Sequence, residues 1–134
     1  MFERLGDEDV CYLTTTGRTS GKPHQIEIWF GLRDGTLYLL SGGGDSADWV
    51  RNVRKHAAVT VRIGSRTASA EARIIRPNTA EDAAARELLD GKYMGWRAGK
   101  KLSSWARGAL PVAIDVSGGR LRRPRRRAPA AGRP

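Results

Sequence analysis

The stretch LLSGGGDSADWVRN, Leu39 to Asn52, joins an apolar run to the start of an expected helix through three consecutive glycines. Glycine loses more backbone freedom on folding than any other residue, so a run of glycines destabilises a chain unless something requires it. The requirement is either a tight turn or a ligand that lies directly against the main chain. Asp45 or Ser46 is expected to cap the following helix, which runs to about Lys55.

Segments with the alternation and composition of β-strands lie on both sides of this stretch. In the clearest of them Ile26, Ile28 and Phe30 share one face, and Asp34-Gly35 then predicts a tight hairpin turn. The expected strands are 10–16, 23–32, 36–40, 58–63, 67–76 and 110–116. Short antiparallel strands with helices inserted after the third and fifth predict a mainly β fold, a small six-stranded barrel.

The composition is that of one soluble globular domain, with 134 residues of which 40% are hydrophobic and 28% charged. No apolar run is long enough to span a membrane, and the N-terminus lacks the apolar core of a signal peptide. A cytoplasmic location is therefore expected. The single cysteine, Cys11, lies in the apolar run VCYL and is expected to be a buried thiol.

The net charge of +10 is concentrated at the C-terminal end. Residues 119–134, GRLRRPRRRAPAAGRP, contain seven arginines and no acidic residue, so the remaining chain is only mildly basic. This composition without apolar periodicity predicts a disordered tail after a folded domain of residues 1–118. The tail could bind nucleic acid or anionic lipid electrostatically, or could simply be a solvated end.

Standard catalytic constellations are absent from the sequence. His24 and His56 belong to separate elements and no Cys/His set has metal-binding spacing, so no metal site is expected. Neither a Walker loop nor a nucleophile elbow occurs. An enzyme with this sequence would therefore take its reactivity from a cofactor.

Two segments have the composition of anion-binding sites. In residues 14–24, TTTGRTSGKPH, hydroxyls and glycines surround Arg18 and Lys22. Free backbone N–H groups and a bidentate arginine are suited to hold a phosphate. In residues 41–49, SGGGDSADW, the glycines precede a helix N-terminus, where amides point outward. Both segments are also compatible with ordinary glycine turns.

The order of these motifs resembles the deazaflavin-dependent nitroreductase family. That family belongs to the flavin-binding split β-barrel superfamily, along with the pyridoxamine phosphate oxidases. The resemblance rests on TTTGRTSGKPH, an Asp-Gly hairpin, LLSGGG, DWVRNVRKHAAVTVRIG and the AR of the following strand, and it covers roughly residues 10–116. It implies an antiparallel split β-barrel that binds the 8-hydroxy-5-deazaflavin coenzyme F-420.

The resemblance also implies roles for individual residues. The phosphate and oligoglutamate tail of the coenzyme would lie against the GRTSGK loop, and its ring near SGGG and the start of the helix. The candidate cofactor-binding residues are Thr16, Arg18, Ser20, Gly21, Lys22, Ser41, Gly42, Gly43, Gly44, Trp49 and Asn52. Late aromatic residues line the substrate side in the family, which makes Tyr93 the candidate catalytic residue, as a donor of a hydrogen bond or a proton to the substrate.

Trp29 and Trp96 are the candidates for contact with the substrate. Tyr93 and Trp96 are three residues apart and are expected to share one helical face. The sequence departs from the family at IEIWF, where Glu27 and Trp29 replace the usual proline and leucine.

The expected function is hydride transfer from the reduced coenzyme to a small electrophile such as a quinone, an enone or a nitroaromatic, and split barrels of this kind suggest a homodimer. One alternative is a flavin mononucleotide (FMN) protein of the same fold, either an oxidase or a flavin carrier. The other is a nucleic-acid-binding protein that acts through its arginine-rich tail.

Overall fold

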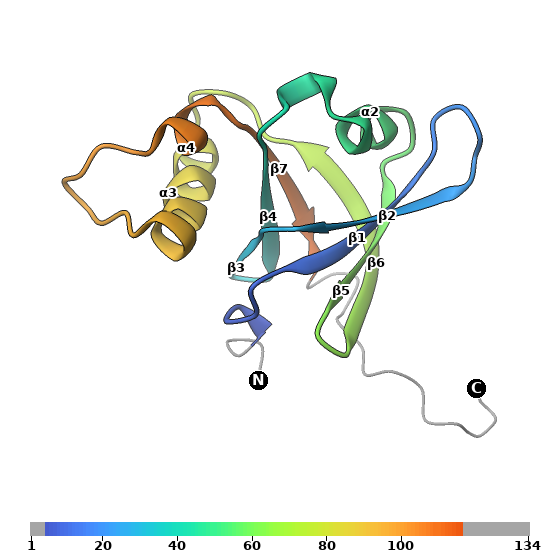
Figure 1. Ribbon diagram of the computed structural model, residues 1–134, viewed down its shortest axis with the longest axis horizontal. Helices are drawn as coiled ribbons and strands as arrows, with labels where there is room; N and C mark the ends of the chain where they lie inside the picture. The colour runs from blue at the N-terminus through green and yellow to red at the C-terminus, as the bar shows by residue number, and fades with distance from the viewer. Residues whose placement is uncertain (1–4, 117–134) are drawn as a thin grey trace.

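Seven antiparallel strands form one curled sheet in the order β2-β1-β5-β6-β7-β4-β3 (Figure 1). The structure is a computed structural model that describes residues 5–116, so the expected tail at 119–134 lies outside the described residues. The strands are β1 (Cys11–Thr16), β2 (Pro23–Ile28), β3 (Gly31–Arg33), β4 (Thr36–Ser41), β5 (Ala58–Ile63), β6 (Arg66–Ile74) and β7 (Leu110–Asp115). The helices are the 3-10 turn η1 (Gly44–Ser46), α2 (Asp48–Lys55), α3 (Ala80–Met94) and α4 (Ser104–Gly108). Figure 1 shows α2 at one end of the barrel and α3 with α4 at its side.

The barrel closes because one continuous segment supplies both edge strands. β2 pairs with β1, β3 pairs with β4, and only Trp29 and Phe30 lie between them. The expected strand 23–32 is therefore broken into two, and the sheet has seven strands where six were expected. β6 also changes partner along its length, from β5 to β7 after Glu71. The predicted mainly β, antiparallel split barrel is confirmed.

The inward-facing side chains of the strands fill the barrel. Leu13, Phe30, Val61 and Ile63 are all fully buried there. Cys11 is also fully buried, which confirms its interpretation as a buried thiol, and this burial raises the pKa of Cys11 to about 12. The members of this inner cluster are apolar, so their burial stabilises the barrel.

α3 and α4 cover the outer face of β4 and β7. Tyr38 and Leu40 of β4 point outward and pack with Ala85 and Leu89 of α3 and with Ala106 of α4. Because β4 is buried on both faces, its sequence TLYLL is a continuous apolar run without the alternation of a half-exposed strand. None of the helices within residues 5–116 is long and apolar enough to cross a membrane.

The ends of α3 explain one correct and one wrong expectation. The sequence predicts Asn78 or Thr79 as the cap of this helix, and Thr79 is the cap, because its hydroxyl accepts a hydrogen bond from the Asp82 N–H at 3.1 Å. The helix ends at Met94, because Gly95 adopts a left-handed conformation with φ of 75°. The expectation that Trp96 shares a helical face with Tyr93 is therefore wrong: Trp96 lies in the loop after the helix.

The start of α2 also differs from the expectation. The residue that precedes its first turn is Ala47, which forms no side-chain cap. Asp45 and Ser46 do not cap α2, because the chain first makes the 3-10 turn η1 that contains both of them. Asp45 instead accepts a hydrogen bond from Arg54 Nε at 2.7 Å. The helix ends at Lys55, as predicted.

Close contact between β3 and α3 gives a prediction for stability. A Cβ atom at Gly31 would stand 2.7 Å from Leu88 Cδ2 and 2.8 Å from Leu88 Cγ. We expect Gly31→Ala to lower the free energy of unfolding by about 1–3 kcal/mol, the usual cost of overpacking, as measured by urea denaturation. Gly108→Ala is the control, because no atom lies within 4 Å of a Cβ at that position. Equal effects of the two substitutions would contradict the close packing of α3 on β3.

Candidate functional site

The glycine-rich loop between β1 and β2 is tight and folds toward α2. The Gly17 N–H donates to Lys22 O at 2.7 Å, and the Gly21 N–H donates to Gly17 O at 2.9 Å. The Ser20 hydroxyl accepts a hydrogen bond from the Lys22 N–H at 3.1 Å. The loop is therefore held in one shape by its own backbone groups.

Asn52 of α2 fixes this loop to the barrel. Its side chain is 4% exposed, and its amide nitrogen donates to Thr15 Oγ1 at 3.1 Å. Its amide oxygen accepts from the Arg18 N–H at 3.1 Å and from Arg18 Nη1 at 2.9 Å. Arg18 Nη2 also pairs with Asp48 Oδ1 at 3.1 Å. A buried amide must be hydrogen-bonded, and here its bonds determine where the Arg18 guanidinium lies.

A cleft of about 420 Å³, called here the loop cleft, opens between this loop, α2 and the start of β2. It is lined by Thr15, Gly17, Arg18, Thr19, Ser20, His24, Gln25, Ile26, Asp48, Trp49 and Asn52. The hydrogen bonds to Asn52 and Asp48 use only part of the Arg18 donor fork, so donors remain for an anion.

The loop cleft brings together some of the expected cofactor-binding residues but not all. Arg18, Ser20, Trp49 and Asn52 line it. Thr16, Gly21 and Lys22 belong to the same loop or its edge without lining the cleft, and Lys22 is exposed. The other lining residues were not among the candidate cofactor-binding residues. Thr15, Gly17, Thr19, His24 and Asp48 lie within the two segments with the composition of anion-binding sites, whereas Gln25 and Ile26 lie outside both. Thr15 and His24 face each other across the β1–β2 hairpin, so the loop expected between the strands 10–16 and 23–32 is the sequence signal that could have indicated both.

The three-glycine segment after β4 is only partly explained as a turn. Gly44 has a φ of +59°, which favours glycine, and the buried Ser41 hydroxyl donates to Gly44 O at 3.0 Å. Gly43 has no such requirement, since a Cβ there would stand 3.5 Å from Ala47 Cβ, an ordinary contact. A Cβ at Gly42 would meet only Trp105, at 3.9 Å. The fold of the chain therefore needs one of the three glycines.

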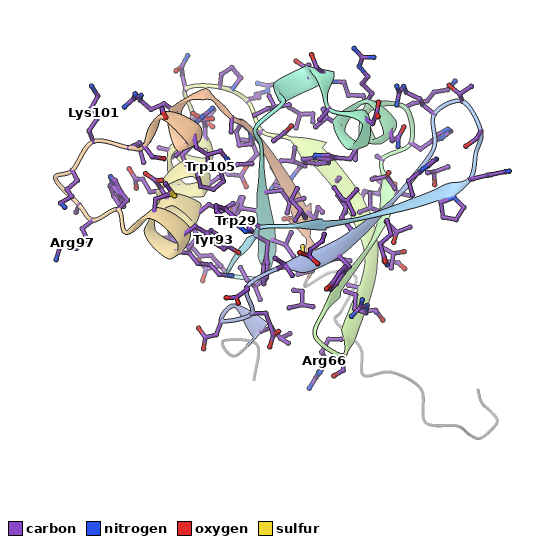
Figure 2. The ribbon with its side chains drawn as sticks, viewed as in Figure 1. Trp29, Arg66, Tyr93, Arg97, Lys101 and Trp105 are labelled. Atoms are coloured by element: carbon purple, nitrogen blue, oxygen red, sulfur yellow. The ribbon has the colours of Figure 1, made fainter. Side chains whose placement is uncertain are left out.

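Three aromatic rings gather where the barrel closes, beside α3 and α4 (Figure 2). Trp29 stacks on Tyr93 with ring centroids 4.3 Å apart and planes at 3°. Trp105 of α4 meets both rings edge-on, at 5.4 Å from Trp29 and 6.5 Å from Tyr93. Trp96 has no ring contact among the described residues, and its indole N–H donates to Lys100 O at 2.7 Å. Sequence reasoning assigned no site role to Trp105.

The Tyr93 hydroxyl is occupied by backbone groups. It accepts a hydrogen bond from the Phe30 N–H at 3.0 Å, and its proton is directed to Asp9 O at 2.7 Å or Phe30 O at 3.0 Å. Burial raises the pKa of Tyr93, which keeps the hydroxyl protonated. Lys92 donates to Glu8 O at 2.6 Å and to Phe30 O at 3.1 Å, and burial lowers the pKa of Lys92. Both side chains of α3 thus bind the main chain at the break between β2 and β3.

A second cleft of about 260 Å³, called here the aromatic cleft, lies beside these rings. It is lined by Val10, Glu27, Ile28, Trp29, Leu40 and Trp105. Gln25 and Ile26 line the loop cleft, whereas the next residues, from Glu27 to Trp29, line the aromatic cleft. The two clefts therefore follow each other along β2, and Gly42 lies next to Trp105 of the second one.

Comparison with known proteins identifies the relatives of this chain. A model of the F420H(2)-dependent quinone reductase family matches residues 2–116. In sequence, no protein of curated function matches the chain significantly.

Similar solved structures include a conserved hypothetical protein from Mycobacterium tuberculosis, with a TM-score of 0.67, 18% identity and coverage of 84% of this chain and 75% of that one. The heme storage protein from Vibrio cholerae has a TM-score of 0.67 at 12% identity, with 86% of each chain covered. A structure described as an F420-H2 dependent reductase has a TM-score of 0.61 at 17% identity, covering 79% of this chain and 93% of that one. At these identities the likeness shows the fold alone, because one fold supports different functions.

The match to the family model confirms the resemblance that the motif order indicated. It spans nearly every residue that the structure describes and includes both clefts. The chain therefore belongs to the F420H(2)-dependent quinone reductase family and is an oxidoreductase that uses coenzyme F-420.

Proposed function

We propose that this protein transfers a hydride from reduced coenzyme F-420 to a small planar electrophile, such as a quinone, an enone or a nitroaromatic, held in the aromatic cleft. The observation that carries this proposal is the succession of two clefts with different chemistry along β2. The coenzyme has an anionic tail at one end and a flat ring at the other, so it fits a polar cleft with an arginine followed by a bare main-chain segment and aromatic walls.

The loop cleft suits the phosphate and the acidic tail. Arg18 is already oriented by Asn52, so less side-chain entropy is lost when its remaining donors bind an anion. Ser20 adds a hydroxyl at the cleft wall, and Lys22 adds a positive charge next to it on the same loop. Because Asp48 neutralises part of the Arg18 charge, Lys22 matters for the total attraction.

The segment from Ser41 to Gly44 suits the ring. Gly42 and Gly43 have room for a side chain but lack one, so a flat ligand can lie against the main chain there. Ring carbonyls would accept hydrogen bonds from backbone N–H groups. The bound coenzyme supplies the hydride, and the protein orients the two reactants and donates hydrogen bonds where negative charge develops.

The walls of the aromatic cleft suit the acceptor. Trp29 and Trp105 offer flat apolar surfaces against which a planar ring can stack. We propose that Tyr93, the expected proton donor, instead positions Trp29, because its hydroxyl is already bonded to main-chain atoms. Trp96 has its place in the loop after α3, and its expected contact with the acceptor stays a prediction.

The remaining expectations concern partners and location. The homodimer and the cytoplasmic location stay predictions. No finding supports the nucleic-acid alternative, which depends on residues outside the described part of the chain. The flavin mononucleotide alternative is disfavoured by the family match, and a competition titration of the two cofactors would test it.

The anion-binding role of the loop gives the first functional prediction. We expect the double variant Arg18→Ala with Lys22→Ala to raise the dissociation constant of the coenzyme at least about tenfold, while kcat at saturation changes little, because this binding is uniform between ground and transition states. Fluorescence titration at low and high salt measures the dissociation constant of the coenzyme, and rising salt should weaken binding to the wild-type protein. Arg33→Ala with Lys101→Ala removes the same charge outside both clefts and is the control. Unchanged affinity in the loop variant would refute the assignment.

The glycine segment gives the second functional prediction. Gly43→Ala and Gly43→Val should lower coenzyme affinity in that order, with a loss of more than about tenfold for valine, because their side chains fill the space of the ring. The melting temperature should fall by less than about 4 °C, since the protein leaves room for a Cβ at this position. Affinity and melting temperature are measured on the same samples. A large loss of stability with normal binding in the folded fraction would make Gly43 a turn residue only.

The role of Tyr93 gives the third functional prediction. Tyr93→Phe keeps the ring that stacks on Trp29 but removes the hydroxyl from the Phe30 main chain. We expect the free energy of unfolding to fall by about 1–3 kcal/mol, the cost of leaving buried polar groups unpaired. We expect kcat to change less than about threefold, well below the loss typical of a missing general acid. A fall of kcat by about a hundredfold at unchanged stability would restore the proton-donor role.

A further inference from the structure

A carboxylate stands in the wall of the aromatic cleft. Glu27 of β2 and Trp29, which follows the end of that strand, both line the cleft together with Trp105. Trp29 is 44% exposed although it is a large apolar residue. One face of its ring stacks on Tyr93, so a ligand ring would meet the opposite face. The cleft thus combines aromatic surfaces with one negative charge.

Within residues 5–116 no cation forms an ion pair with this carboxylate. The described bond of Glu27 is the one that Oε1 accepts from the Tyr12 hydroxyl at 3.2 Å. Arg62 lies over the Tyr12 ring, 4.2 Å from its centroid, and donates a hydrogen bond to Gly64 O; it keeps its charge there but forms no ion pair with Glu27. Tyr12 therefore orients the carboxylate without neutralising it.

We propose that the aromatic cleft selects planar acceptor rings by their charge, binding cationic rings best, neutral rings next and anionic rings least. This rests on the proposed function, in which the cleft holds the acceptor. A cationic ring gains both from the negative faces of the tryptophans and from the carboxylate. An anionic ring is repelled by the same two features.

The polarity of the two clefts supports this assignment. The loop cleft has the Arg18 donor fork, partly neutralised by Asp48, with Lys22 adding a positive charge on the same loop, whereas the aromatic cleft has the negative charge of Glu27, and both clefts share β2. An acidic coenzyme tail is therefore favoured in the loop cleft and disfavoured in the aromatic cleft. The opposite charges of the two clefts would thus orient the coenzyme, and they would also favour rings without negative charge in the aromatic cleft.

The expected size of the effect follows from the distance between charges. A unit charge about 4 Å from the carboxylate changes affinity about fivefold even in the dielectric of water, so a cation and an anion should differ about 25-fold. Cation–π attraction at an exposed site adds about two- to fivefold for the cation. Salt should reduce the carboxylate contribution, because the cleft is open to solvent.

Three probes that share one bicyclic ring test the proposal on the coenzyme-free protein: N-methylquinolinium, quinoline and quinoline-6-sulfonate. Each is titrated into nitrogen-15-labelled protein, and the indole N–H resonances of Trp29 and Trp105 report binding. Trp29→Phe and Trp105→Phe assign these resonances. The Trp96 resonance is the internal control, because its indole N–H is bonded within its own loop. We expect the dissociation constants to rise in the order given, with at least about a tenfold difference between cation and anion.

Glu27→Gln keeps the shape of the side chain and removes its charge. The ratio of affinities for the cationic and the anionic probe should then fall to about two- to fivefold, the preference that the aromatic rings alone provide. Glu71→Gln is the matched control, since Glu71 is exposed on β6 and lines neither cleft. The ratio should stay as in the wild type in this control, and high salt should lower it in the wild type. An unchanged ratio in Glu27→Gln, or no movement of the two indole resonances with any probe, would overturn the proposal. A separate coenzyme titration distinguishes this failure from failure of the proposed function, because the probes bind without coenzyme.

Discussion

The barrel closes at Phe30, and the hydrogen bonds made there fix the position of α3 and of the aromatic rings beside it. Where the chain passes from one edge of the sheet to the other, the N–H and C=O of Phe30 lose their partners in the ladder. An unpaired buried backbone group costs about as much as a lost hydrogen bond. Tyr93 and Lys92 of α3 supply the missing partners, so closing the barrel and docking α3 are one event.

The same closure builds the aromatic cleft. Because Tyr93 is held to the main chain of Phe30, its ring has a fixed position, and Trp29 stacks on it. At the other end of β2, the buried amide of Asn52 fixes the wall of the loop cleft by binding Thr15 and Arg18. Each cleft is thus supported by a side chain whose polar atoms are bonded internally, which is the condition for a preorganised site. Strand β2 connects the two supports.

Features that depend on neighbouring residues could be predicted from the sequence. The alternation of residues 26–30 within the expected strand 23–32, the Asp34-Gly35 turn with φ of 53° and 80°, and the Thr79 cap are local, and all three are found. The break of that strand depends on Tyr93, 63 residues away from Phe30, and no local pattern indicates it. The position of Trp105 beside Trp29 likewise depends on the docking of α4, a contact between residues far apart in the sequence. Sequence patterns therefore indicated the loop cleft better than the aromatic cleft.

The loop cleft and the aromatic cleft are formed by different segments of the chain, so the proposed acceptor site can change while the proposed coenzyme site stays the same. The segments that carry the family resemblance, GRTSGK and SGGG, lie on the proposed coenzyme side, whereas the departure at IEIWF places Glu27 and Trp29 in the aromatic cleft, the proposed acceptor side. Trp29 is tied to barrel closure through Tyr93, so its replacement would disturb the fold as well as the cleft. Glu27 is exposed and bonded only to Tyr12 among the described residues. Its charge can therefore vary at little cost to stability, and in the proposed function position 27 would set acceptor preference independently of coenzyme binding.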